Sequence, residues 1–297
     1  MESEFKTGHS IETITKIAYS KGKSFRDELE RSENPNYMFR PLQIFLDAFS
    51  IDLKNKKILD FGCGAGAFAL NLVKLGADEL VGVEVEEGLI DIARLRVHDF
   101  YPESRFKIIP IQYIDGNYRL PFGDAEFDIV WPHAVLEHVF PNQRGFVLQE
   151  LWRVLKPNGT FILDGTPNGL WIKEAHTSNL FFINYLPLEM AAFFARRFSS
   201  RVPRNQSTEN LLVRGFRGSH YWEISKYLPG AEWVGLQTRK EFSVKIKSWL
   251  RESDSPIKSA MKKAIGLILL IIDPVLRLLR LPQTAVMPWL LVVLRKK

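Results

Sequence analysis

Short strand-like segments alternate with helix-like segments through the middle of this 297-residue chain, and this alternation restricts its fold more than any other feature. The segments predicted as strands are 57–61, 79–84, 105–111, 127–131 and 159–164. Predicted helices at 67–75, 88–100 and 142–155 lie between them. Strands joined by helical crossovers in units of about 25 residues pair in parallel, with right-handed connections. We therefore predict an α/β fold with a doubly wound, mostly parallel sheet and ligands at the carboxyl ends of its strands.

A glycine-rich turn follows the first predicted strand in the sequence ILDFGCGAGAFAL, residues 58–70. Gly62, Gly64 and Gly66 allow a sharp turn and the close approach of a ligand, and the next helix points its N-terminus at that ligand. Asp60 stands at the tip of the strand, and Glu84 ends the following strand. Asp60 would repel a pyrophosphate but attract an ammonium or sulfonium group, whereas Glu84 can accept hydrogen bonds from ribose hydroxyls. This pairing favours S-adenosylmethionine, although the glycines alone also fit the dinucleotide pattern of NAD.

Five segments resemble, in the same order, the class I S-adenosylmethionine-dependent methyltransferases, with a core of the methyltransferase type 11, ubiquinone-pathway-like kind. These segments are ILDFGCGAG, VGVE, LPFGDAEFDIV, HAVLEHV and RVLKPNGTFIL. The resemblance implies a Rossmann-like sheet of seven strands, with the last strand, near 289–294, antiparallel at or near the edge. It also implies that the glycine turn surrounds the methionyl part of the cofactor and that Glu84 binds the ribose. A polar residue by the adenine is expected, and Asp115 is our candidate, one residue from the usual acidic place.

Three histidines are candidates for catalysis. Transfer to a hydroxyl benefits from a base that removes its proton, and histidine titrates near neutral pH. His133 and His138 follow the fourth predicted strand, and His176 lies in the segment after the fifth. Each of them has the alternative role of a hydrogen-bonded residue that shapes the pocket. No metal ligands are assigned.

The sequence argues against a nucleic-acid base as the acceptor and leaves the ribose of RNA as an alternative. Methylation at cytosine C5 needs a cysteine nucleophile, and the only cysteine, Cys63, lies in the glycine turn. Adenine amino-methyltransferases have an Asp/Asn/Ser-Pro-Pro-aromatic run after the fourth strand, and the run Trp131-Pro132-His133-Ala134 at this place lacks the second proline. Residues 166–187, TPNGLWIKEAHTSNLFFINYLP, look like a segment of bacterial methyltransferases associated with cell-surface glycan or lipid-linked saccharide synthesis. Trp171, Phe181, Phe182 and Tyr185 of this segment are candidate acceptor contacts, with packing of a loop as the alternative.

We therefore predict O-methylation of a small-molecule, lipid-linked saccharide or quinone-type acceptor. The alternatives are an NAD-dependent oxidoreductase on the same fold and a non-catalytic protein that binds a membrane or partner and keeps a relict cofactor site. The expected organisation has four parts. These are an N-terminal helical segment (1–55), the cofactor-binding core (56–166), a cap insertion (167–230) and a C-terminal part (231–297) with final strands and an apolar, basic helical insertion (245–287).

Charge is distributed unevenly along the chain. Residues 191–297 hold 20 Lys and Arg against 7 Asp and Glu, whereas residues 1–190 hold 20 against 27. Within the basic part, the apolar run 264–272 is nine residues long, and a membrane-spanning helix needs about 20. Residues 256–281 are therefore predicted to lie on an anionic membrane surface, with a dimer interface or a core helix as alternatives. A single cysteine and the absence of a secretory signal at the start predict a cytoplasmic, peripherally bound protein.

Overall fold

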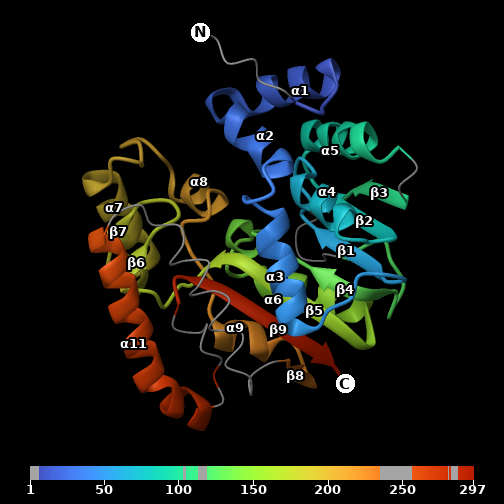
Figure 1. Cartoon of the computed structure of the whole chain (residues 1–297). Coiled ribbons are helices and arrows are strands. Elements are labelled where there is room, and N and C mark those ends of the chain that lie inside the picture. The colour runs from blue at the N-terminus through green and yellow to red at the C-terminus, as the bar shows by residue number, and fades with distance from the viewer. Residues whose placement is uncertain (1–6, 103–104, 113–118, 235–255, 280, 282–286) are drawn as a thin grey trace.

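A computed structural model of the chain describes residues 7–102, 105–112, 119–234, 256–279, 281 and 287–297. Its centre is a seven-stranded sheet in the order β3-β2-β1-β4-β5-β9-β8 (Figure 1). The strands are β1 (Lys57–Phe61), β2 (Glu79–Glu84), β3 (Arg105–Pro110), β4 (Phe127–Trp131), β5 (Leu155–Pro167), β8 (Ala231–Trp233) and β9 (Trp289–Lys296). The first five pair in parallel, and β9 runs antiparallel between β5 and β8. The predicted fold is confirmed, including an antiparallel last strand next to the edge.

Helices cover both faces of the sheet because its strands are apolar on both sides. On one face, the side chains of Ile58, Ile129 and Trp131 pack against the helices α3 (Phe39–Phe49) and α4 (Ala67–Lys74). The neighbouring α5 (Glu87–Phe100) packs on β3. The opposite face packs against α6 (Arg144–Val154) and α9 (Tyr221–Lys226). Strands buried on both faces are expected where helices form the crossovers of a parallel sheet.

The N-terminal helices α1 (Ile11–Lys21) and α2 (Phe25–Glu33) form an outer layer, joined by the short 3₁₀ turn Gly22–Ser24. The helix α1 packs on α5, and α2 packs on α4 (Figure 1). A buried ion pair joins α2 to α5, in which Arg96 Nη1 lies 2.7 Å from Glu28 Oε1. This layer therefore covers α4 and α5, the helices that follow β1 and β2.

The cap lies between β5 and α9 and has a small apolar core of its own. Its elements are β6 (Lys173–Glu174), β7 (Leu180–Phe181), the 3₁₀ turn Ile183–Tyr185, α7 (Leu188–Phe198) and α8 (Thr208–Val213). The chain leaves and re-enters the core at one place, because Ser219 N donates to Pro167 O and Gly169 N donates to Ser219 O. The buried Arg144 of α6 closes this junction by donating to the carbonyls of Arg217 and Gly218. The cap is thus fixed beside the carboxyl ends of β4 and β5.

The helix α11 (Pro256–Leu278) belongs to the predicted 245–287 insertion, of which residues 245–255, 280 and 282–286 lie outside the described residues. It continues through Pro274 and contacts the core through Leu276, which packs with Tyr221 and Leu281. Large apolar side chains project from it into solvent, among them Ile268 and Ile271 at 56% and 69% exposure. Within the described residues, we find no helix whose length and apolar content would let it span a bilayer.

Candidate functional site

A cavity of about 770 Å³ opens at the carboxyl ends of β1, β2 and β4. Such a volume suits a ligand of cofactor size. The glycine turn, the end of β2 and the loop after β4 form its floor, and residues of α1 and α2 reach it from above. Its polar and charged lining side chains are Lys21, Glu28, Arg31, Asp60, Glu84, Glu86, His133 and His138.

The glycines of the turn between β1 and α4 have different surroundings. A Cβ on Gly66, where φ is +77°, would lie 2.8 Å from the Cα of Ala93, so this glycine lets α5 pack closely. Gly62 packs in the same way against Val135. A Cβ on Gly64 would meet no protein atom within 4 Å, and Gly64 lines the cavity. Only Gly64 therefore leaves its open side to a ligand, whereas the other two hold the turn against its neighbours.

Glu84 holds the turn in place. Its Oε2 accepts a hydrogen bond from Gly64 N at 2.9 Å, and its Oε1 accepts from Val85 N at 2.7 Å and Glu86 N at 3.1 Å. An ionised carboxylate has about four acceptor sites, of which the backbone uses three. Glu84 therefore both supports the glycine turn and keeps capacity for a further hydroxyl donor.

Asp60 is a buried acidic residue of the cavity with one unpartnered oxygen. Its side chain is 1% exposed, and its Oδ2 has no hydrogen-bond partner among the described residues. Burial raises the pKa of Asp60 to about 7; Glu84 and Asp164 also raise it, whereas His133 opposes the shift. A buried carboxylate without a partner is costly, so this position gains from a ligand that brings positive charge.

His133 forms a pair with Asp164 of β5. Its Nδ1 lies 2.8 Å from Asp164 Oδ1, which also accepts from Trp131 Nε1. The imidazole stacks on Phe68, with ring centroids 4.2 Å apart. Burial lowers the pKa of His133, but the carboxylates of Asp164, Asp60 and Glu137 together raise it above its usual value, with Asp164 the largest of the three. With Nδ1 held by Asp164, Nε2 is the nitrogen left to exchange a proton.

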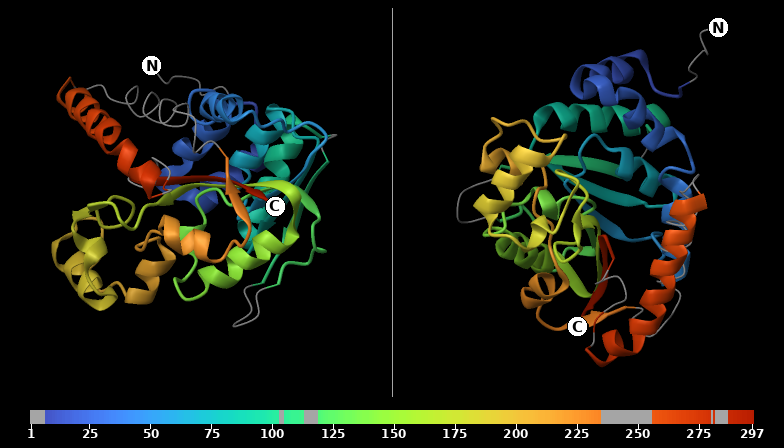
Figure 2. Two further views of the ribbon diagram at one scale, coloured as in Figure 1. Left: turned by 90° about the horizontal axis from the view of Figure 1, so that it is seen from below. Right: turned by 90° about the vertical axis from the view of Figure 1, so that its left-hand side faces the viewer.

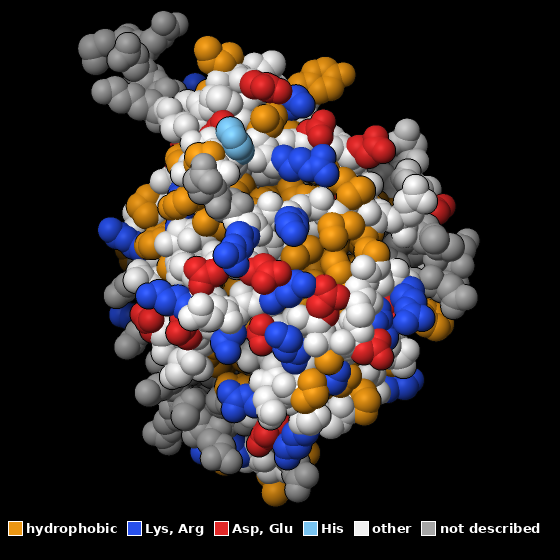
Figure 3. Space-filling model, turned by 90° about the vertical axis from the view of Figure 1, so that its right-hand side faces the viewer, with side chains coloured by type: hydrophobic (Ala, Val, Ile, Leu, Met, Phe, Trp, Pro, Cys, Tyr) orange, Lys and Arg blue, Asp and Glu red, His pale blue; other side chains and the backbone are white. Residues whose placement is uncertain are grey.

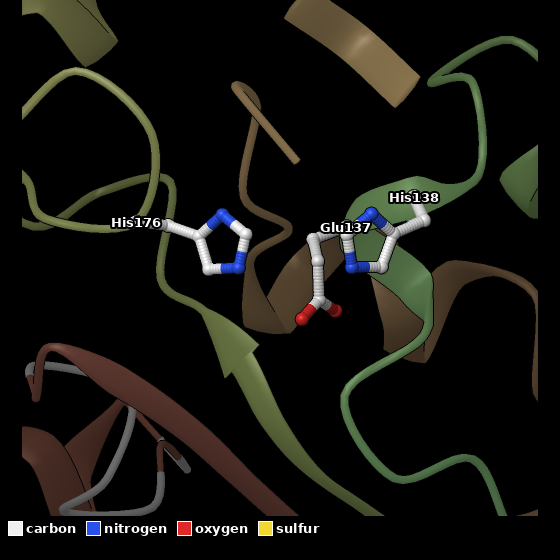
Figure 4. A group of neighbouring side chains, drawn as sticks. All are labelled: Glu137, His138 and His176. Atoms are coloured by element: carbon white, nitrogen blue, oxygen red, sulfur yellow. The ribbon is translucent and has the colours of Figure 1, made fainter. Parts of the chain in front are cut away.

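His138 and His176 face each other at the border between core and cap (Figure 4). Their ring centroids are 5.7 Å apart, and His138 lines the cavity, whereas His176 does not. Glu137 lies between them and is 2% exposed. Burial lowers the pKa of His176, with His138 acting in the same direction and Glu137 against it. The three predicted histidines therefore divide into one beside Asp60 and two at the cap.

Known proteins match the core of the chain. Residues 59–163 match the family described as a methyltransferase domain. The 27-O-demethylrifamycin SV methyltransferase of Amycolatopsis mediterranei is 30% identical over 38% of this chain and 42% of its own length. The ubiquinone biosynthesis O-methyltransferase of Hydrogenovibrio crunogenus is 27% identical over 60% of this chain and 64% of its own. The solved PH0226 protein of Pyrococcus horikoshii is 31% identical over 45% of this chain and 63% of its own, with a TM-score of 0.37.

Residues 59–163 therefore match a methyltransferase domain, and the seven-stranded sheet that contains them has the Rossmann-like methyltransferase fold. The chain spans less than two thirds of the length of the curated relatives described above, and the matched family covers residues 59–163 only.

The residues present fit the methyltransferase cofactor. The orphaned Oδ2 of Asp60 suits the positive charge of the methionyl ammonium or sulfonium. The open side of Gly64 allows the chain to approach the ligand closely, and the remaining acceptor site of Glu84 suits one ribose hydroxyl. The backbone already occupies most of the Glu84 carboxylate, which limits the direct binding of both ribose hydroxyls that we expected.

Several candidate site residues from the sequence analysis do not line the cavity, or lie outside the described residues. Asp115 lies outside the described residues. Trp171 and Tyr185 line a separate hollow of about 280 Å³, and Phe181 and Phe182 are about 60% exposed. Lys21, Glu28 and Arg31 also line the cavity, and the sequence analysis did not predict them as site residues. Their distance along the chain from the glycine turn leaves no local signal that would have found them.

Proposed function

We propose that this chain transfers the methyl group of S-adenosylmethionine to an oxygen of a small-molecule, lipid-linked saccharide or quinone-type acceptor. The observation that carries the proposal is Asp60, a buried carboxylate with an unpartnered oxygen beside the glycine turn. A cationic ligand lowers the free-energy cost of burying the Asp60 carboxylate, whereas the pyrophosphate of NAD would place further negative charge beside it. The alternative of an NAD-dependent oxidoreductase is therefore disfavoured. The alternative of a relict, non-catalytic site is also disfavoured, because the glycine turn is intact and Gly64 N donates a hydrogen bond to Glu84.

The proposed reaction is an in-line displacement in which position matters most. The cofactor supplies an electrophilic methyl group on a sulfonium. Asp60 would hold the positive end of the ligand, the Gly62–Gly66 turn would surround the methionyl part and Glu84 would bind a ribose hydroxyl. The acceptor oxygen forms a bond to the methyl carbon as the bond from that carbon to sulfur breaks. S-adenosylhomocysteine leaves as the second product.

His133 is the candidate we favour for the general base. Its hydrogen bond to Asp164 fixes the ring, and the same carboxylate favours the imidazolium that forms when Nε2 accepts the acceptor's proton. It lines the cavity beside Asp60. His138 and His176 lack such a carboxylate–histidine hydrogen bond, because their Nδ1 atoms lie against Val213 O and Thr177 Oγ1.

Oxygen is the proposed methylated atom for two reasons. The relatives from Amycolatopsis mediterranei and Hydrogenovibrio crunogenus carry names that describe O-methylation. A base paired with a carboxylate also suits a hydroxyl acceptor, whose proton must be removed.

A membrane-associated acceptor is proposed from the surface of the molecule. The helix α11, with its exposed apolar side chains, and the helix α7, whose Phe193 and Phe198 are about 60% exposed, both lie on the left-hand side of Figure 1. Seen from that side, the two helices stand apart (Figure 2). Arg196 and Arg197 lie in the last turn of α7, and Lys263 is an exposed basic residue of α11. On the right-hand side of the molecule, acidic, basic and apolar side chains are interspersed instead (Figure 3). We propose a cytoplasmic enzyme whose cap end rests on an anionic membrane surface.

The test of this function uses a cofactor with an isotopically labelled methyl group. The intact protein is incubated with lipid-linked sugars, quinone precursors and small phenols, and products are separated by mass. We expect label on an acceptor oxygen, and we expect His133→Gln to lower turnover by a larger factor than it lowers the affinity for S-adenosylmethionine. The affinity should fall only because the variant loses the charge that opposes the raised pKa of Asp60. Label on nitrogen or carbon would overturn the proposed O-methylation, and turnover unchanged in His133→Gln would remove His133 as the base.

A further inference from the structure

Glu137, His138 and His176 converge although two different parts of the chain supply them. Glu137 and His138 belong to the 3₁₀ turn Leu136–His138 after β4, whereas His176 belongs to the cap. One ligand atom of each lies within 4.8 Å of the other two. Figure 4 shows the two imidazoles facing each other above the Glu137 carboxylate. Two imidazoles and one carboxylate at this separation are a ligand set for a divalent transition metal.

Hydrogen bonds set the tautomers of both imidazoles. His138 Nδ1 lies 2.7 Å from Val213 O, and since a carbonyl only accepts, this nitrogen carries the proton. His176 Nδ1 lies 3.2 Å from Thr177 Oγ1, whose own proton is donated to Arg214 O at 2.9 Å. Thr177 therefore accepts from His176. Both rings are left with an unprotonated Nε2, the form that binds a metal ion.

The carboxylate is held as firmly as the rings. Glu137 is 2% exposed, and its Oε2 accepts from Thr166 Oγ1 at 2.9 Å. The cap segment 213–215 supplies both carbonyls that orient the imidazoles and packs against the cluster. A Cβ on Gly215, where φ is +80°, would lie 2.7 Å from His176 Cε1 and 3.2 Å from Glu137 Cγ. Carbonyl and hydroxyl partners behind each ligand are the usual support of a metal site in proteins.

From this geometry we propose that Glu137, His138 and His176 bind one divalent transition metal ion, such as Zn²⁺ or Mn²⁺, which holds the acceptor's oxygen. Three protein ligands leave coordination positions open, and His138 also lines the cofactor cavity. The metal lowers the pKa of a bound acceptor hydroxyl, which gives its proton to Nε2 of His133, and the resulting oxyanion bonds to the methyl carbon as the sulfur–methyl bond breaks. This role rests on the proposed methyl transfer, whereas the binding of the metal does not.

The test is a titration of the intact, metal-stripped protein, without a purification tag, with Zn²⁺ by calorimetry and with Co²⁺ by visible absorption. We expect one ion per chain and ligand-field bands of a site with nitrogen and oxygen ligands. His138→Gln and His176→Gln should each weaken binding by more than about tenfold. Thr177→Val keeps all three ligands but removes the acceptor behind His176, so a smaller loss is expected. His98→Gln, which changes an exposed histidine of α5, is the matched control and should leave binding unchanged.

Circular dichroism of each variant separates a lost ligand from a lost fold. Absence of saturable binding to the folded wild-type protein, or equal losses in His98→Gln and His176→Gln, would overturn the metal site. S-adenosylmethionine binding is measured on the same samples. A protein that binds this cofactor but no metal contradicts the present inference alone, whereas one that binds metal but no cofactor contradicts the proposed methyl transfer.

Discussion

Asp60 sits in an environment that disfavours its own charge. It is buried at the end of β1, close to the like charges of Glu84 and Asp164. A protein built for stability alone would favour a neutral side chain at this position. A cationic ligand would offset the free-energy cost of this buried charge. Carboxylates with strongly shifted pKa values are common at functional sites.

This environment predicts a pH dependence of cofactor affinity. The pKa of Asp60 is raised to about 7, so below this pH the carboxyl is protonated and must release its proton when a cation binds. We expect the affinity for S-adenosylmethionine to fall with decreasing pH below about 7, by at most tenfold per pH unit. Calorimetry across this range measures it. Asp60→Asn should bind weakly with little pH dependence, and an equally steep dependence in that variant would assign the proton to another group.

The stability of the cofactor-free protein should change with the opposite sign. Because the folded pKa of Asp60 lies above its ordinary value of 3.8, its charge destabilises the fold as pH rises from about 4 to about 7. The same raised pKa thus weakens cofactor binding at low pH and weakens the cofactor-free fold at high pH.

Sequence reasoning reached the residues of the site that lie in one continuous pattern. Asp60, the glycines, Glu84 and His133 follow strand ends, where a parallel sheet places its ligands. Asp164 was assigned only to a strand, because nothing local shows that its side chain turns to His133. The grouping of His176 with Glu137 and His138 depends on where the cap folds back onto the core. The spacing of these residues along the sequence does not predict that position.

At the scale of single elements, the parallel strands and their crossover helices were predicted within a few residues. The strand β8 has three residues, too few for a recognisable alternation. The helix α6 ends at Val154, and β5 begins at Leu155, earlier than the predicted 159. Pro157 fits at this early part of the strand, where the pairing with β4 is irregular between Phe127 and Ile129.

A buried ion pair is one of the contacts that join the N-terminal helices to α5. Arg96 is fully buried, and its partner Glu28 lines the cavity. We expect Arg96→Ala to destabilise the protein by about 3–5 kcal/mol, because it leaves the buried Glu28 with only the more distant, partly exposed Arg31, at 3.8 Å, as a counter-charge. It should also weaken S-adenosylmethionine binding, since α2 would lose its link to α5.

Urea unfolding and calorimetry measure the two effects. Arg94→Ala is the control on the same helix, because Arg94 is half exposed and lies 3.9 Å from its partner Asp91. That change should alter stability by less than about 1 kcal/mol. Equal effects of the two substitutions would show that the buried pair does not hold the N-terminal layer.

At the scale of the whole molecule, the account predicts membrane association through α11. Leu267, Ile268 and Ile271 are all more than half exposed. The intact protein should co-sediment with anionic vesicles at low salt, less with neutral vesicles and less at high salt. Replacing the three residues by Ser should abolish binding while the fold persists.

The matched control changes exposed apolar residues of another helix, α1. Ile11 and Tyr19 of α1 are 84% and 95% exposed, and their replacement by Ser should leave vesicle binding unchanged. If the wild-type protein ignores vesicles, or forms a dimer that covers α11, the membrane proposal is wrong and the dimer or core alternative replaces it.

The central claim is that the cavity binds S-adenosylmethionine through paired carboxylates, and calorimetric titration with this cofactor and with NAD tests it most directly. We predict one S-adenosylmethionine bound per chain and no heat from NAD. Glu84→Ala should weaken cofactor binding by about 1–3 kcal/mol, since it removes an acceptor for ribose and a support of the Gly64 backbone. Binding of NAD without S-adenosylmethionine, or an unchanged affinity in Glu84→Ala, would contradict the account.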